Sequence, residues 1–237
     1  MTECAVLKNN HLDRVICQLR YNPIFSLESR IGEFQSAIGP EYPVSGVTIE
    51  PPIPRFPTAP VINNYSFGSQ DGHWTVNITN SFITLSCNRY ISWDEFKSRL
   101  GYVLDAFFKY FEVKCFERVG LRYINTIRPS KLKLESTPGI WSQILNPKTI
   151  GPMDLFTGRI DSYTSRVDAS LDDCRVTSSI GTIRFNDDGE IGFLIDNDLY
   201  QEHVNRDLLQ TNISILNARA YDLLERMTSK DLRRRME

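Results

Sequence analysis

The chain has 237 residues, of which 41% are hydrophobic and 24% are charged, and its formal net charge is −2. This length allows one large domain or two small ones with a substantial core, and the composition is globular rather than disordered or fibrous. No apolar run approaches the roughly 18 residues of a membrane span and the first residues carry no secretory signal pattern, so we expect a cytoplasmic protein without a membrane partner.

The chain contains five cysteines, an odd number, and no C-x-x-C pair. A disulfide framework or a cysteine zinc site would need paired or closely spaced residues. We therefore expect reduced thiols. Three of the five lie in or beside predicted strands, where cysteine packs as a small apolar residue: Cys17, Cys87 and Cys115.

Strand and helix periodicities alternate along the first half of the chain. The first helix follows Ser26, which we expect to cap it, and ends at Gly39-Pro40. The second helix begins at an S-x-x-E capping box that opens with Ser92. Between the helices, residues 51–60 hold five prolines and predict a polyproline II segment on the surface. The predicted strands of this half are 14–21, 44–50, 74–80, 82–90 and 116–127.

The second half begins with a loop-rich region, residues 130–158, in which one short helix is predicted near residues 139–145. Three strands follow, and a hairpin turn at residues 186–189 joins the last two. A long amphipathic helix begins near Asp207. The predicted strands of this half are 162–171, 174–185 and 190–195.

These elements predict an α+β protein with a mostly antiparallel sheet and long packed helices. Residues 1–130 would form a ferredoxin-like half with the element order β-α-β-β-β-α-β. Residues 131–237 would form a second half with the order β-β-β-α, packed with the first as one unit.

Charge is unevenly distributed along the chain. Residues 114–133 contain six basic residues against one glutamate, and residues 187–207 contain seven carboxylates against one arginine. The two runs could meet inside the fold, or they could attract a charged partner. A further basic group ends the chain: Lys230, Arg233, Arg234 and Arg235.

The stretch FERVGLRYIN, residues 116–125, places Arg118 and Arg122 on one face of a predicted strand, with Gly120 between them. A glycine leaves bare backbone that another group can approach closely. The simpler interpretation pairs the arginines with carboxylates of neighbouring strands. The alternative is a partner- or anion-binding site, because the planar guanidinium group suits phosphates and carboxylates. The candidate set for that site is Arg118, Arg122, Arg128, Lys131 and Lys133.

The R-x-G-L-R-Y-I-N stretch, after an aromatic-rich helix that opens with Trp93 and Phe96, resembles a sporadically distributed family of bacterial proteins of unknown function. Residues 17–25 and 190–228 are also similar to that family, so the likeness covers most of the chain, but only the GLRYIN strand is specific. The resemblance implies a bacterial cytoplasmic protein. Such scattered distribution is common among mobile, defence and toxin–antitoxin genes. The family offers no established catalytic residues to transfer.

Residues suited to catalysis or metal binding are few. The three histidines occur in no recognised metal-binding spacing, and no nucleophile, phosphate-loop or dinucleotide motif is present. Asp196, Asp198 and His203 form the one cluster that could hold a cation. A turn or helix cap is the simpler interpretation of Asp196-Asn197-Asp198. We therefore predict no catalytic residues, no metal site and no cofactor.

The function that these observations favour is a non-catalytic bacterial protein-interaction module, within a defence or toxin–antitoxin system, whose partner is a protein encoded nearby. The alternative is a nucleic-acid-binding protein that uses the basic strand and the arginine-rich tail on phosphates. Oligomerisation stays open.

Overall fold

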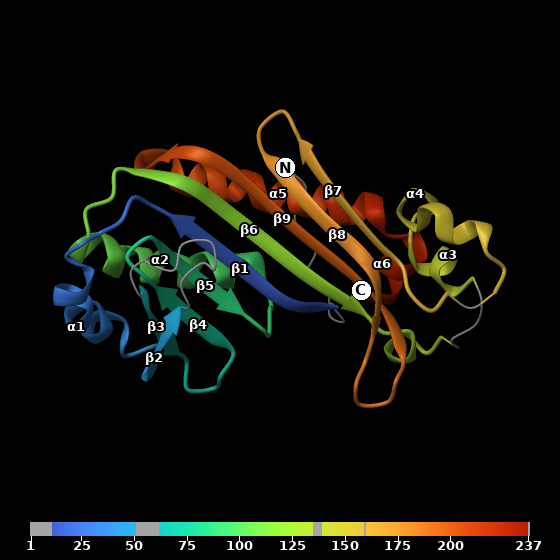
Figure 1. Cartoon of the computed structure of the whole chain (residues 1–237), viewed down its shortest axis with the longest axis horizontal. Coiled ribbons are helices and arrows are strands. Elements are labelled where there is room, and N and C mark those ends of the chain that lie inside the picture. The colour runs from blue at the N-terminus through green and yellow to red at the C-terminus, as the bar shows by residue number, and fades with distance from the viewer. Residues whose placement is uncertain (1–10, 51–61, 135–138, 159, 237) are drawn as a thin grey trace. The chain divides into compact units, whose positions relative to one another are not determined.

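The structure, a computed structural model, describes residues 11–50, 62–134, 139–158 and 160–236. They contain a nine-stranded antiparallel sheet with the strand order β2-β3-β4-β5-β1-β6-β9-β8-β7 (Figure 1). The predicted α+β class with an antiparallel sheet is confirmed. The described helices are α1 Leu27–Ile38, α2 Trp93–Tyr110, α3 Ile140–Ile144, α4 Pro147–Ile150, α5 Leu209–Met227 and α6 Lys230–Met236.

The strands agree closely with the predicted ones, with two exceptions described below. Their bounds are β1 Leu12–Arg20, β2 Val44–Glu50, β3 Ile62–Gly68, β4 Trp74–Ile78, β5 Phe82–Cys87, β6 Cys115–Ile127, β7 Thr164–Ser170, β8 Arg175–Arg184 and β9 Ile191–Asn205. Short 3₁₀ turns accompany them: η1 Ser130–Leu132, η2 Gly151–Leu155 and η3 Arg206–Leu208.

The chain divides into two compact units, and each unit draws on segments that are far apart in sequence. The described residues of unit 1 fall within 11–13, 122–199 and 214–236, and those of unit 2 fall within 14–121 and 200–213. The long strands β6 and β9 therefore contribute residues to both units. The division into sequential halves at residue 130 stays a prediction.

In unit 2, the helix α2 lies on one face of the strands and buries its apolar side there (Figure 1). The Ser92 side chain accepts a hydrogen bond from the Glu95 backbone N–H at 3.2 Å, so the predicted N-cap is confirmed. The prediction that Ser26 caps α1 is wrong: its side chain makes no capping bond, and its carbonyl accepts from the Ser29 hydroxyl instead. The buried residues of α2 are Phe96, Leu100, Val103, Leu104, Ala106 and Phe107.

The strand β3 was not predicted, so the first half has one more strand than expected. Its sequence, INNYSFG, contains two asparagines and a glycine, which have low strand propensity. Pairing with β2 on one side and β4 on the other holds it in the sheet, so tertiary context outweighs local preference. The predicted polyproline II segment, residues 51–60, lies outside the described residues.

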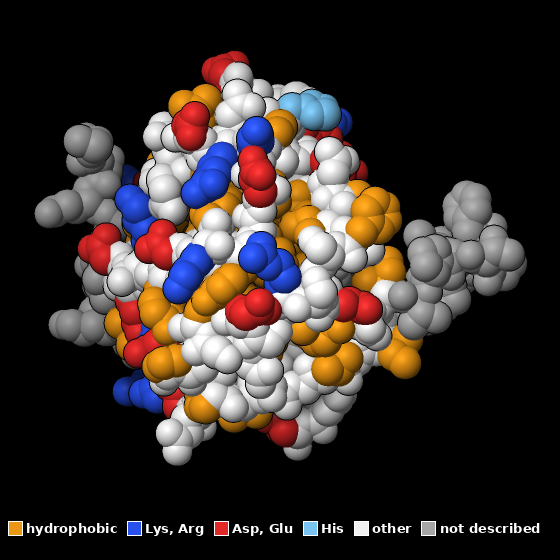
Figure 2. Space-filling model, turned by 90° about the vertical axis from the view of Figure 1, so that its left-hand side faces the viewer, with side chains coloured by type: hydrophobic (Ala, Val, Ile, Leu, Met, Phe, Trp, Pro, Cys, Tyr) orange, Lys and Arg blue, Asp and Glu red, His pale blue; other side chains and the backbone are white. Residues whose placement is uncertain are grey.

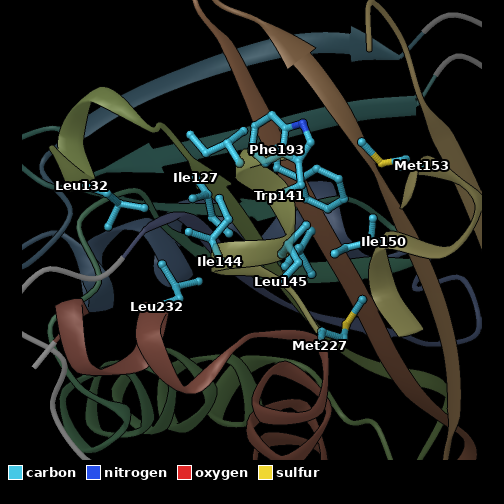
Figure 3. Close-up of a cluster of buried hydrophobic side chains, with 12 residues drawn as sticks. Ile127, Leu132, Trp141, Ile144, Leu145, Ile150, Met153, Phe193, Met227 and Leu232 are labelled. Atoms are coloured by element: carbon cyan, nitrogen blue, oxygen red, sulfur yellow. The ribbon is translucent and has the colours of Figure 1, made fainter. Parts of the chain in front are cut away.

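In unit 1, a buried cluster joins the short helices to β9 and the C-terminal helices (Figure 3). The rings of Trp141 and Phe193 lie 5.4 Å apart between centroids. The one short helix predicted near residues 139–145 is present as α3, and its buried residues belong to this core rather than to a surface loop. The cluster consists of Ile127, Leu132, Ile140, Trp141, Ile144, Leu145, Ile150, Met153, Phe193, Ile195, Met227 and Leu232.

The strand β9 extends ten residues beyond its predicted end at residue 195, to Asn205. The prediction of a turn or cap at Asp196-Asn197-Asp198 is wrong. Asn197 is buried, and its amide interacts with the Ser178 hydroxyl at 2.7 Å and the Met227 sulfur at 3.5 Å. Because these contacts satisfy a buried polar side chain inside the strand, the chain continues extended through a sequence typical of turns.

The cysteines that the structure describes all have free thiols: Cys17, Cys87, Cys115 and Cys174. Burial raises the pKa of Cys17 to about 12 and is the main cause that raises the pKa values of Cys87 and Cys174 to about 11. These three buried thiols are poor nucleophiles near neutral pH, because the thiolate is the reactive form. Cys115 is exposed instead, so the prediction that it packs as a small apolar residue is wrong.

Candidate functional site

Arg118, in the predicted anion-binding set, lies against Tyr200 on the neighbouring strand. Its guanidinium carbon is 4.2 Å from the centroid of the tyrosine ring, a cation–π contact. The same guanidinium covers Gly120, where an added Cβ would lie 2.5 Å from Arg118 Nη1. The space beside the glycine is therefore occupied by an arginine of the same strand.

Arg122 is held by a carboxylate on β9, as in the simpler of the two sequence interpretations. Its Nε donates to Asp196 Oδ1 at 2.8 Å and its Nη2 donates to Asp196 Oδ2 at 2.6 Å, a bidentate pair. The hydrogen bond to Asp196 raises the pKa of the Arg122 guanidinium, while partial burial acts in the opposite direction and the charge of Asp198 adds to the rise. Arg122 is thus matched by acidic groups within unit 1.

Arg128 is surrounded by carboxylates of the β8–β9 hairpin. Its guanidinium nitrogens lie 3.0 Å from Asp187, 2.6 Å from Asp188 and 2.9 Å from Glu190. The guanidinium carbon also lies 4.0 Å from the centroid of the Phe185 ring. The basic run and the acidic run of the sequence therefore meet here, as they do at Arg122.

Glu190 connects this hairpin to η1. Its carboxylate accepts from the Ser130 backbone N–H and from the Ser130 hydroxyl, both at 2.7 Å. Burial alone would raise the pKa of Glu190, but the bonds from Ser130 and Arg128 outweigh it and hold the pKa below its ordinary value. The Glu190 carboxylate is therefore charged, and both of its oxygens accept hydrogen bonds from groups within the fold.

The remaining members of the predicted set, Lys131 and Lys133, are exposed in and beside η1. They belong to unit 1 with Arg122 and Arg128, whereas Arg118 belongs to unit 2. The tail arginines are also ion-paired: Arg233 with Glu225 at 3.2 Å, and Arg234 and Arg235 with Asp231 at 3.5 and 2.9 Å.

The three residues that could have held a cation, Asp196, Asp198 and His203, do not form a metal site among the described residues. Asp196 binds Arg122, and His203 is exposed on β9 with a positive φ of 55°. Among the residues that the structure describes, no group of three His, Cys, Asp or Glu side chains is placed to hold a metal ion.

A pocket of about 370 Å³ opens beside α2 in unit 2, and sequence analysis did not find it. Arg99 in its wall contacts Glu41 at 3.5 Å and Glu95 at 3.4 Å, and its guanidinium carbon lies 4.7 Å from the Trp74 ring. Burial raises the pKa of Tyr42 to about 12. The Tyr42 hydroxyl is buried and has no hydrogen-bond partner among the described residues. The pocket is lined by Glu41, Tyr42, Glu95, Ser98, Arg99 and Tyr102.

The strand β2 is the most exposed element of the described sheet. All of its residues from Val44 to Ile49 are exposed, and Val44, Val47 and Ile49 are 57%, 60% and 66% exposed. Within the described chain it pairs only with β3 and stands at the end of the strand order. A glycine, Gly46, inside a strand that runs into a proline-rich segment is the sequence signal that could have identified this edge.

The surface charges show no large area of one sign on the face viewed from the α1 end of Figure 1. Figure 2 shows that basic and acidic side chains are interspersed there with apolar ones.

Comparison with protein-family models and with curated proteins finds no match to this chain. The resemblance to the sporadically distributed bacterial family stays a prediction. No helix in the described part of the chain is both long and apolar enough to cross a membrane.

Proposed function

We propose that this protein is a non-catalytic protein-interaction module that binds an extended segment of a partner protein along the β2 edge. The observation that carries the proposal is the exposure of every residue from Val44 to Ile49 on both faces of an edge strand. Edge strands present backbone N–H and C=O groups to a further strand, and natural proteins usually cover or charge them.

The chemistry of β2 supports a polypeptide partner. An added strand would gain main-chain hydrogen bonds, and its side chains would lie beside those of β2. Val47 and Ile49 point to the same face of the strand and are 60% and 66% exposed. Covering them would remove apolar surface from water, at most about 1.5–3 kcal/mol for each side chain.

Nucleic-acid binding is the second proposal, and the structure offers it less support. Nucleic-acid binding depends on Lys and Arg side chains that can contact phosphates and displace their counterions. Arg122 and Arg128 instead carry short ion pairs within unit 1, and Arg118 stacks on Tyr200. Lys131 and Lys133 are the exposed members of the predicted set.

The biological setting follows only from the sequence resemblance. We propose a bacterial defence or toxin–antitoxin system in which the partner is encoded next to this protein. The β2 edge would then hold a segment of that neighbour.

A photo-crosslinking amino acid in place of Val47, in cells that also express the neighbouring genes, tests the proposal. The crosslinked protein is identified, purified and titrated against this chain. The variant Val47→Lys/Ile49→Lys should weaken binding about a hundredfold, because two apolar contacts are lost. Lysine is tolerated on edge strands, so the fold should be retained.

Leu208→Lys is the matched control, because Leu208 is 53% exposed in the same unit but lies outside the sheet. It should bind as the unsubstituted protein does. The proposal fails if no protein crosslinks at position 47, or if the double lysine variant binds within twofold of the unsubstituted chain. Binding to single-stranded nucleic acid that weakens steeply with salt would favour the second proposal instead.

A further inference from the structure

The strand β7 stands at the end of the strand order opposite to β2. The hydrogen bonds at the two ends of β7 show which of its residues direct their backbone N–H and C=O groups toward β8 and which direct them outward. Thr164 pairs with Gly181, and Ser170 pairs with Arg175. Beyond these, the Leu171 N–H donates to the Cys174 carbonyl at 2.8 Å and the Thr182 N–H donates to the Tyr163 carbonyl at 2.9 Å.

The odd-numbered residues of β7 therefore direct their backbone groups toward β8, because hydrogen-bonded pairs alternate along an antiparallel ladder. The even-numbered residues direct theirs toward the outer edge: Thr164, Arg166, Asp168 and Ser170. In the part of the chain that the structure describes, no strand pairs with that edge (Figure 1).

The sequence of β7, TSRVDAS, is nearly self-complementary about its central residue, Val167. Reversed against itself, it places Arg166 opposite Asp168 of a second copy and Asp168 opposite Arg166. Val167 then meets Val167, and it is 54% exposed in the single chain. In this one alignment opposite charges face each other, the two valines are in contact, and the outward backbone groups of the two strands can form hydrogen bonds with each other.

Shifted alignments of the two strands are destabilised because they place like charges opposite each other. The outer edge permits only shifts that keep even-numbered residues opposite each other. One such shift places Arg166 opposite Arg166, and the shift in the other direction places Asp168 opposite Asp168. Like charges directly opposite each other in a sheet are destabilising, so the charges that protect this edge also select one self-pairing.

We propose that two copies of this chain associate through antiparallel pairing of their β7 strands, with a two-fold axis at Val167. Within each chain the Arg166 Nε lies 3.2 Å from the Asp168 carboxylate, and both side chains are more than 60% exposed. In the dimer each of these aspartates lies between the arginine of its own chain and the arginine of the partner copy. Such an interface is isologous, since the same patch serves both copies.

The contact is small, because β7 has only seven residues. Standard stable interfaces are much larger, so weak association is expected and should be measured up to about 100 μM chain. The proposal does not depend on the partner proposed for β2, which occupies the other end of the strand order.

Charge exchange gives the sharpest test, with sedimentation equilibrium as the measurement. Arg166→Asp alone and Asp168→Arg alone each place like charges opposite each other, so each should raise the dimer dissociation constant about tenfold or more. The two single variants mixed in equal amounts restore both opposite-charge pairs and should associate about as tightly as the unsubstituted chain. The double variant Arg166→Asp/Asp168→Arg should do the same.

A cysteine at position 167 tests the register independently. The two-fold axis makes Val167 a non-hydrogen-bonded pair with its copy, with Cα atoms about 4.5 Å apart, a spacing that a disulfide can span. With Cys4 and Cys115 replaced by Ser, Val167→Cys should form a covalent dimer under mild oxidation. Ser165→Cys is the control, because its opposite residue is Ala169 and no disulfide should form.

The proposal is overturned if the unsubstituted chain stays monomeric at about 100 μM. It is also overturned if both single charge variants dimerise unchanged, or if their mixture fails to associate. Crosslinking at position 165 without crosslinking at position 167 would overturn the register. Restored association of the mixture together with crosslinking at position 167 would establish it.

Discussion

Replacing Arg122 by Ala should destabilise the protein more than replacing its partner Asp196 by Ala. The Asp196 side chain is 14% exposed, whereas the Arg122 side chain is 45% exposed. Loss of the arginine leaves a carboxylate that water reaches poorly, with Asp198 on the same face of β9. Loss of the aspartate leaves a guanidinium group that water can solvate. Removing one partner of an ion pair costs more when the charge that remains is the buried one.

The geometry sets the size of the expected effect. The two hydrogen bonds measure 2.8 and 2.6 Å, and bonds to charged groups contribute about 1.5–3 kcal/mol each when buried. A fully exposed ion pair contributes only about 0–1 kcal/mol. Because Arg122 is nearly half exposed, we expect a loss of about 2 kcal/mol for Arg122→Ala and about 1 kcal/mol for Asp196→Ala. The double variant should show a coupling of about 1 kcal/mol.

Urea unfolding at pH 7 measures these differences, and Arg226→Ala is the matched control. Arg226 also pairs with an aspartate, Asp222, but the two side chains are 73% and 45% exposed. We expect this control to cost about 0.5 kcal/mol or less. If Arg122→Ala and Asp196→Ala cost no more than the control and show no coupling, the pair is not structural. Arg122 would then be better explained as a ligand-binding residue.

Two further predictions follow from other contacts. Gly120→Ala should stabilise the protein by about 0.5–1 kcal/mol in an Arg118→Ala background but not in the unsubstituted protein. The reason is that the three atoms nearest the added Cβ all belong to Arg118. Urea unfolding that shows the same effect in both backgrounds would contradict this prediction. Hydrogen bonds from Arg219 lower the pKa of Asp173. The folded protein therefore gains stability from this pair above about pH 4, and it loses that stability as the pH falls through the lowered pKa of Asp173. Arg219→Gln should therefore lose less thermal stability than the unsubstituted protein between pH 7 and pH 3, and equal losses would contradict the prediction.

Local signals in the sequence predicted most of the elements, because they depend on neighbouring residues. The cap at Ser92, the alternation along β7 and the turn at residues 186–189 are each encoded within a few positions. The strand β3 was missed because INNYSFG lacks strand propensity and depends on two paired neighbours. The continuation of β9 was missed because Asn197 is satisfied by Ser178 and Met227, which are distant in sequence.

The candidate site was harder to predict for the same reason. The sequence shows that Arg122 is basic, but not that Asp196, 74 positions away, will meet it. Two interpretations of the basic run were open, and only spatial pairing distinguishes them at Arg122 and Arg128. Gly120 was recognised as a position that another group could approach, yet the approaching group is a side chain of the same strand.

The two ends of the sheet differ in how they can choose a partner. Residues 44–49 of β2 carry no charge, so no like-charge contact within them rejects a shifted alignment. Selectivity there must come from how a partner's side chains cover Val47 and Ile49. On β7, Arg166 and Asp168 reject the neighbouring alignments of a second copy and leave one. A change of charge on β7 should therefore alter self-association without altering what binds to β2, and lysines on β2 should do the reverse.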